Sequence, residues 1–219
     1  MAELKAFFDD ATNTVTYLVW DPATRAAAII DPVLDFDPAP GRLTSKSADL
    51  VLGAAKDLGL KVEWILDTHA HADHLSAADY LRRETGAKLV IGAEITRIQK
   101  TFLPVFGPVE DHPDGKVFDV LLKEGDTLPL GETKIGVLHT PGHTAACVTY
   151  LVDDMAFVGD TLFQPDYGTA RTDFPGGDAH ALYRSIRKIL ALPPETRILT
   201  GHDYLPAGRT AHAWESTVA

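Results

Sequence analysis

Four residues that can each bind a metal ion lie close together in the segment His69-Ala70-His71-Ala72-Asp73-His74. His69 and His71 are separated by one residue, so in an extended backbone their side chains point to the same side. Asp73 and His74 then begin a turn toward the next helix. Neutral imidazole and carboxylate hold zinc, iron or manganese, and a cluster without cysteine favours a catalytic site with an open position over a closed structural zinc site.

Three further residues of types that can bind a metal lie beside later predicted strands: His143 in HTPGHT, Asp160 in GDTLF and His202 in GHD. A histidine taken singly is usually a surface or core residue, and it is the spacing of the first motif that indicates metal binding. The histidines without such a context are interpreted as surface or supporting residues: His112, His139, His180 and His212.

The elements that must position these residues can be predicted from hydrophobic patterns. A short apolar strand over residues 62–66 places the first motif at the carboxyl end of a strand. A helix over residues 76–85, closed by Gly86, and a strand over 88–91 follow it. Further expected elements are a hairpin of strands 14–20 and 26–30, a helix over 47–58 with Ser47 as N-cap, strands 134–138, 147–152, 155–158 and 197–199, and a helix over 180–192.

Alternation of strands and helices in both halves predicts an α/β or α+β sandwich. The chain has 219 residues, 45% of them hydrophobic, which favours one domain over residues 1–219. Its formal net charge is −11 and it has no Lys/Arg cluster, so we expect a small-molecule substrate and neither nucleic acid nor a membrane as partner.

Cys147 is the single cysteine, so no intrachain disulfide can form, and packing is its expected role. The first residues lack the basic start and apolar core of a signal peptide, and no apolar run approaches the length of a membrane span. We therefore expect a cytoplasmic protein.

The segments THAHADH, HTPGHT, GDTLF and GHD together resemble the metallo-β-lactamase superfamily, and the resemblance covers most of the chain. It implies a four-layer αββα sandwich with the metal site at one edge between the two sheets. It also implies the set of ligands: His69, His71, Asp73, His74, His143, Asp160 and His202.

Residues 163–178, FQPDYGTARTDFPGGD, resemble the persulfide dioxygenases within this superfamily, as do HTAACVTY and GHDY. That resemblance implies one Fe(II) held by His69, His143 and Asp160, a 2-His-1-carboxylate triad that oxidises glutathione persulfide with O2 to sulfite and glutathione. The other candidates, His71, Asp73, His74 and His202, would then support the triad through hydrogen bonds.

Two alternatives stay open. The first is a glyoxalase II-like thiolester hydrolase, in which Asp160 bridges two Zn(II) ions and the same four supporting residues hold the second metal. The second is a non-enzymatic iron-binding sensor. Metal stoichiometry and oxygen dependence distinguish them.

Substrate contacts are predicted at Arg171, whose planar donors suit a glutathione carboxylate, and at Tyr167 and Tyr204. The alternative interpretation of Arg171 is an ion pair with Asp173, and that of the tyrosines is simple packing. A homodimer and a rhodanese-like persulfide donor are further partners left open. The chain stops at Ala219 within AHAWESTVA, interpreted as the opening turns of a helix, which predicts a C-terminally shortened domain.

Overall fold

The computed structural model describes residues 1–107 and 112–219. In this part of the chain the strands form two six-stranded sheets and a small third one. The first sheet has the order β1 (Glu3–Asp9), β2 (Thr14–Trp20), β3 (Ala26–Ile30), β6 (Lys61–Leu66), β8 (Lys88–Gly92), β9 (Val120–Leu122). The second has the order β10 (Thr127–Leu130), β11 (Thr133–His139), β12 (Val148–Val152), β13 (Met155–Gly159), β14 (Arg197–Thr200), β15 (Glu215–Thr217).

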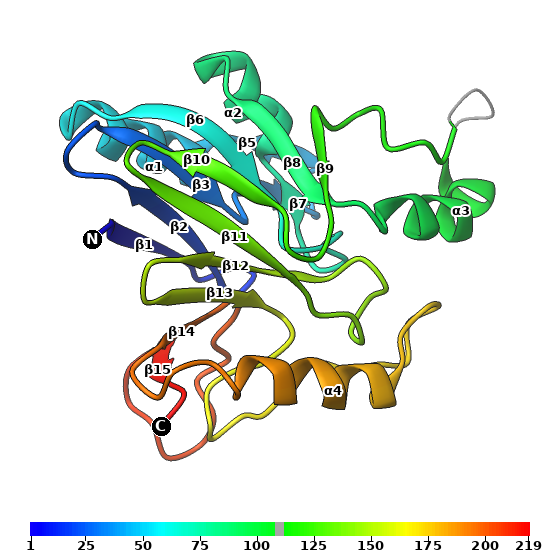
Figure 1. The fold of residues 1–219 in the computed structure, drawn as a ribbon. Helices are drawn as coiled ribbons and strands as arrows, with labels where there is room; N and C mark the ends of the chain where they lie inside the picture. Colours follow the sequence, from blue (N-terminus) through cyan, green and yellow to red (C-terminus); the bar gives the residue numbers. More distant parts are fainter. Residues whose placement is uncertain (108–111) are drawn as a thin grey trace.

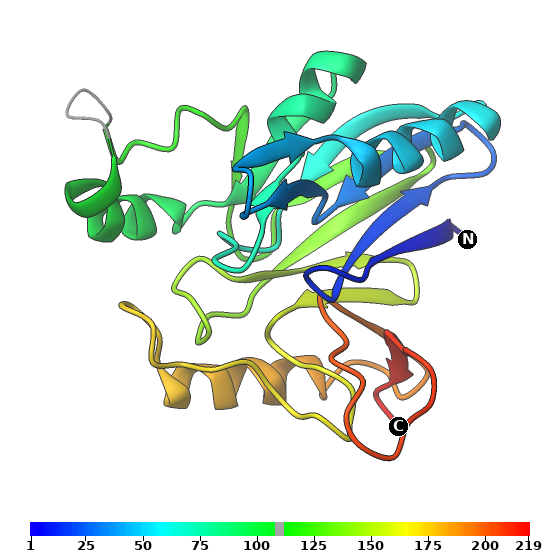
Figure 2. The same ribbon diagram turned by 180° about the vertical axis from the view of Figure 1, so that it is seen from behind.

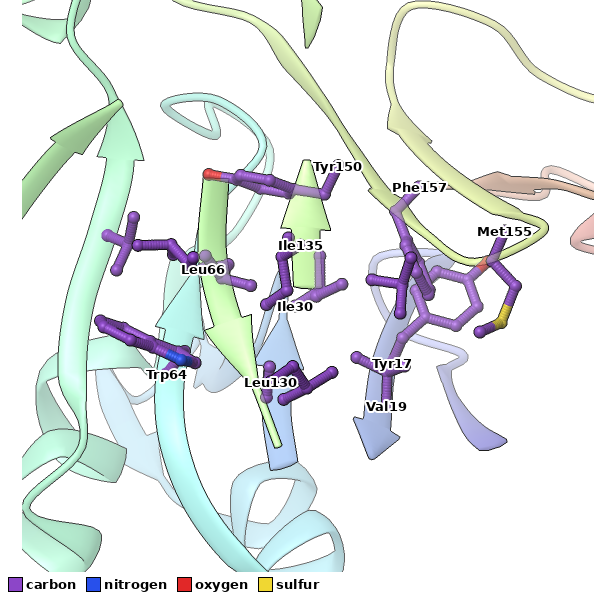
Figure 3. Close-up of a cluster of buried hydrophobic side chains, with 14 of the residues drawn as sticks. Tyr17, Val19, Ile30, Trp64, Leu66, Leu130, Ile135, Tyr150, Met155 and Phe157 are labelled. Atoms are coloured by element: carbon purple, nitrogen blue, oxygen red, sulfur yellow. The ribbon is translucent and has the colours of Figure 1, made fainter. Parts of the chain in front are cut away.

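The two large sheets face each other across one hydrophobic core, which Figure 3 shows in close-up. Three aromatic residues of this core also reach across it with their polar ends. Tyr17 donates to the carbonyl of Thr200 at 2.7 Å, Tyr150 to that of Asp67 at 2.9 Å, and Trp64 to that of Pro129 at 2.7 Å. Each bond joins one sheet to the other, so the core fixes their relative position.

Helices cover the outer faces of both sheets (Figures 1 and 2). α1 (Lys46–Asp57) and α2 (Ala78–Thr85) pack on the first sheet, and α4 (Ala179–Ile189) packs on the second. The predicted four-layer αββα sandwich is therefore confirmed. α3 (Ile95–Phe106) extends beyond the edge of the first sheet, and no helix in the described part of the chain is long and apolar enough to cross a membrane.

The small sheet has the order β5 (Arg42–Thr44), β4 (Val33–Asp37), β7 (Leu75–Ser76). β4 continues directly from β3, and β7 directly follows the histidine motif. This sheet therefore lies beside the carboxyl ends of the parallel strands β3, β6 and β8.

Several expectations need correction. The C-terminal segment is not a helix: Glu215–Thr217 pairs with β14 as an edge strand. The first helix begins at Lys46, one residue earlier than predicted, and its N-cap is Ser45 instead of Ser47. The last helix ends at Ile189 instead of Leu192. The second helix begins at Ala78 because Ser76 belongs to β7, while Gly86 ends it with φ of 73° as expected. Strands 14–20 and 26–30 are confirmed to the residue.

A core substitution tests the packing between the sheets. Phe157 is 1% exposed and meets Tyr17 edge-on at 5.2 Å between ring centroids. We expect Phe157→Ala to lower the free energy of unfolding by about 3–5 kcal/mol, because the cavity left behind cannot close fully. Denaturant unfolding measures this. Tyr183→Ala on the exposed face of α4 is the control, and an equal loss in both variants would contradict the assigned core.

Candidate metal centre

The predicted ligands come from strand ends of both large sheets. His69 follows β6, and His71, Asp73 and His74 lie in the loop from β6 to β7. His143 lies between β11 and β12, Asp160 directly after β13 and His202 just after β14. A backbone hydrogen bond joins the two sheets at this point: the amide of Val148 donates to the carbonyl of Thr68 at 2.9 Å.

His69, His143 and Asp160 form a buried inner group. Both imidazole Nε2 atoms face the same carboxylate oxygen, Asp160 Oδ2, at 3.7 Å from His69 and 3.8 Å from His143. The three ligand atoms lie within 4.8 Å of one another. This arrangement fits one metal ion with two nitrogen ligands and one oxygen ligand.

The hydrogen bonds of the two imidazoles fit a metal as well. His143 Nδ1 lies 2.8 Å from the carbonyl of Arg171, which can only accept, so this nitrogen carries the proton and Nε2 keeps its lone pair. His69 Nδ1 lies 3.0 Å from Thr68 Oγ1, whose own proton goes to Asp31 Oδ2 at 2.8 Å. Among the described residues, buried His69 Nε2 has no hydrogen-bond partner, as a ligand atom requires.

An outer group of candidate ligands lies beside the inner one. His71, Asp73 and His74 also offer ligand atoms within 4.8 Å of one another. His202 Nε2 lies 3.3 Å from Asp73 Oδ2 and 3.4 Å from Asp160 Oδ1. Within the described residues, His71 Nδ1 and His74 Nε2 are buried without a partner. Asp160 thus faces the inner group with Oδ2 and the outer group with Oδ1.

Three supporting residues were missed by the sequence analysis: Asp31, Asp67 and Thr68. Asp31 directly follows β3 and has a φ of 51°. It accepts from the Thr68 amide at 2.7 Å and from the Thr68 hydroxyl at 2.8 Å, and it lies 3.2 Å from His71 Nε2. Gly159 lies against Thr68 and has a left-handed backbone. A side chain has no room at this position, because a Cβ would lie 2.4 Å from Thr68 Oγ1. The sequence does carry a signal for these residues, since each is a polar residue that directly follows a buried strand: Asp31 after β3, and Asp67 and Thr68 after β6.

Burial determines the protonation of the metal-free site. It raises the pKa of Asp160 to about 8, against the lowering effect of His143, and it raises the pKa of Asp31 and of Asp67. It lowers the pKa of His69 and of His71, and neighbouring histidines lower both further. Neutral imidazoles are the form that binds metal.

A cavity of about 640 Å³ opens at the inner group, and the three predicted substrate residues line it. Tyr204 stacks on His202 at 5.3 Å between centroids, and Tyr167 lies 5.0 Å from Tyr204. Arg171 forms the ion pair with Asp173 that was its alternative interpretation, and its guanidinium also lies 4.9 Å from the ring centre of Phe174. The ion pair is confirmed, whereas the contact of Arg171 with substrate stays a prediction.

The residues expected to be supporting have such contacts or are exposed. His139 Nε2 lies 2.9 Å from the carbonyl of Ala145, and His212 Nδ1 lies 2.9 Å from Asp203 Oδ2. His112 and His180 are exposed. Burial raises the pKa of the Cys147 thiol to about 12, so it remains an unreactive packed side chain.

Comparison with known proteins gives a consistent result. The family model of the metallo-beta-lactamase superfamily matches residues 9–202. A probable metallo-hydrolase of Burkholderia pseudomallei is 53% identical over 99% of this chain and 77% of that protein. A beta-lactamase hydrolase-like protein of Agrobacterium fabrum is 55% identical over 98% of this chain, which spans only 50% of that longer protein.

Three further relatives have different names. Glyoxylase B2 of Dictyostelium discoideum is 41% identical over 95% of this chain and 72% of that protein. The crystal structure of ETHE1 from Myxococcus xanthus is 34% identical, with a TM-score of 0.76 over 99% of this chain and 80% of that chain. Persulfide dioxygenase ETHE1 of Homo sapiens is likewise 34% identical, over 92% of this chain and 68% of that protein.

Removal of one inner imidazole tests the inner group. We expect His143→Ala to abolish iron binding there, because only His69 and Asp160 remain. Elemental analysis after loading measures it, with circular dichroism as a check on folding. His180→Ala, an exposed histidine on α4, is the control. Full iron content in His143→Ala would remove His143 from the ligand set.

The raised pKa of Asp160 makes metal uptake depend on pH. Below about pH 8 the metal-free carboxyl holds a proton that a metal must displace, so the apparent metal affinity should rise with pH up to that value. Zinc titration calorimetry in buffers of different ionisation enthalpy gives the protons released. We expect Asp160→Asn to release fewer than the unchanged protein, and an equal number would contradict the assignment.

Proposed function

The chain belongs to the metallo-beta-lactamase superfamily, and we propose that it is a persulfide dioxygenase that oxidises glutathione persulfide with O2 at one Fe(II). The single observation that carries the proposal is the buried inner group of His69, His143 and Asp160. Two imidazoles and one carboxylate are the facial triad of non-haem Fe(II) oxygenases. The similarity to persulfide dioxygenase ETHE1 supports the same chemistry.

The proposed reaction is balanced. Glutathione persulfide, O2 and water give glutathione and sulfurous acid, which ionises to sulfite. The S–S bond breaks, the sulfane sulfur is oxidised, and O2 is reduced; the third oxygen of sulfite comes from water. Iron(II) supplies the redox chemistry with O2 that no side chain of the group has.

The residues around the inner group bind and orient the substrate in this proposal. The cavity of about 640 Å³ lies within the size range of small-molecule sites. The aromatic side chains of this cavity would cover the glutathione part of the substrate and exclude water. They are Phe163, Tyr167 and Tyr204. The carbonyl of Asn13 lies 3.2 Å from His202 Nδ1 and fixes the orientation of this ring. His202 Nε2 therefore points at Asp73 and Asp160 and would orient both carboxylates by hydrogen bonds.

A glyoxalase II-like hydrolase with two Zn(II) ions is the second candidate. The observation in its favour is the outer group, where buried His71 Nδ1 and His74 Nε2 have no partner among the described residues. Asp160 faces both groups and could bridge two metals. The 41% identity to Glyoxylase B2 is consistent with this chemistry. A metal would then supply the hydroxide that attacks a thiolester.

Metal content together with oxygen uptake separates these functions. We expect one iron per chain and, on addition of glutathione persulfide, oxygen consumption with sulfite formation. His143→Ala, loaded in the same way, is the inactive control. Two zinc ions with thiolester hydrolysis and no oxygen uptake would replace the proposal by the hydrolase. Bound metal without turnover of either substrate would favour an iron-binding sensor.

A further inference from the structure

A second cavity, of about 680 Å³, opens on the other side of the histidine motif. The hairpin of β4 and β5 forms one wall, and the outer candidate ligands His71, Asp73 and His74 form another. Ala72 and Asp73 line both cavities. The metal motif can therefore be reached from two sides, and we call this second space the hairpin cavity.

The hairpin cavity carries two unneutralised cations. Arg42 and Lys46 line it and are exposed, and neither has an ion-pair partner within 4.0 Å in the described part of this acidic chain. The nearby Asp35 carboxylate accepts from the Ser47 amide at 2.9 Å and hydroxyl at 2.8 Å. Asp9 accepts from the Thr12 amide at 2.9 Å and hydroxyl at 2.7 Å. These carboxylates are thus engaged locally, which leaves the cations available to an anion.

Two carboxylates of the hairpin cavity are less engaged. One is Asp73, whose Oδ2 lies 3.3 Å from His202 Nε2, and the other is Asp37. Asp37 lies opposite Arg42 in the strand register of β4 and β5 without an ion pair to it, and the amide of Ala39 donates to its carboxylate at 3.2 Å. Phe36 and Leu75, 51% and 46% exposed, add apolar walls. The hairpin cavity therefore offers cations, two less engaged carboxylates and apolar surface together. In the first cavity, among the described residues, Arg171 is the one cation.

We propose that the hairpin cavity binds the γ-glutamyl end of glutathione, while the glycine end lies toward Arg171. Glutathione carries its sulfur on the central residue, so a sulfur at the metal sends one arm to each side of the motif. The γ-glutamyl arm ends in a carboxylate and an ammonium group, which match Arg42 and Lys46 on one hand and Asp37 on the other. The glycine arm ends in a carboxylate alone. This inference rests on the proposed function for the placement of the sulfur.

Calorimetric binding to the metal-loaded protein tests the assignment with ligands that cannot be oxidised. The probes are S-methylglutathione, γ-glutamyl-S-methylcysteine and S-methylcysteinylglycine, the last of which lacks the γ-glutamyl arm. We expect the double variant Arg42→Gln/Lys46→Gln to raise the Kd of the first two ligands about fivefold or more, since two exposed charge contacts are lost. The Kd of S-methylcysteinylglycine should not change.

The control double variant Lys134→Gln/Arg187→Gln removes two exposed cations that have no ion-pair partner within 4.0 Å among the described residues and do not line either cavity. It should leave all three Kd values unchanged. Equal weakening of all three ligands by the hairpin variant, no weakening, or no binding of S-methylglutathione to the unchanged protein would overturn the assignment. Oxygen uptake reports on the proposed function separately: its absence beside the expected binding pattern would overturn the dioxygenase and leave the glutathione site.

Discussion

The site depends on one buried carboxylate, Asp31. β3 and β6 run parallel, with Ile30 opposite Leu66, so the residues that follow them meet at the same edge of the sheet. There Asp31 accepts from the amide and hydroxyl of Thr68 and lies 3.2 Å from His71 Nε2. Through Thr68 it also fixes the proton of His69. One side chain thus determines which ring nitrogen of two histidines faces the centre, and such supporting bonds tune ligand orientation.

The other half of the site belongs to the second sheet, so its geometry depends on how the sheets pack. Tyr150 donates to the carbonyl of Asp67, and the Val148 amide donates to that of Thr68, directly beside the motif. A change in sheet separation would move His143 and Asp160 away from His69. Protein interiors are close-packed and resist such a change. The core of large aromatic and aliphatic residues therefore keeps the metal-binding side chains in fixed positions.

Local patterns predicted the parts of the fold that local sequence determines. Strands 14–20 and 26–30 are apolar and β-branched, and Gly86 has the left-handed φ that ends a helix, so both were predictable. The edge strand at 215–217 forms only by pairing with β14, and the hairpin of β4 and β5 is short and rich in aspartate. The roles of Asp31 and Asp67 follow from the parallel pairing of strands far apart in sequence. The motif predicted the ligand types, whereas the direction of each ring nitrogen required the surrounding hydrogen bonds.

The buried charges at this edge of the molecule favour a bound cation. Burial raises the pKa of Asp31, Asp67 and Asp160, and the charge of Asp31 raises the pKa of the other two further. The same burial lowers the pKa of His69 and His71, which favours the neutral imidazoles that bind metal. A divalent cation would stabilise ionised Asp160 and use the unpartnered His69 Nε2 at once. Asp160 would then distinguish one ion from two. An ion held by His69, His143 and Asp160 would leave the 3.4 Å contact of Asp160 Oδ1 with His202 Nε2 in place, whereas a second ion in the outer group would replace it.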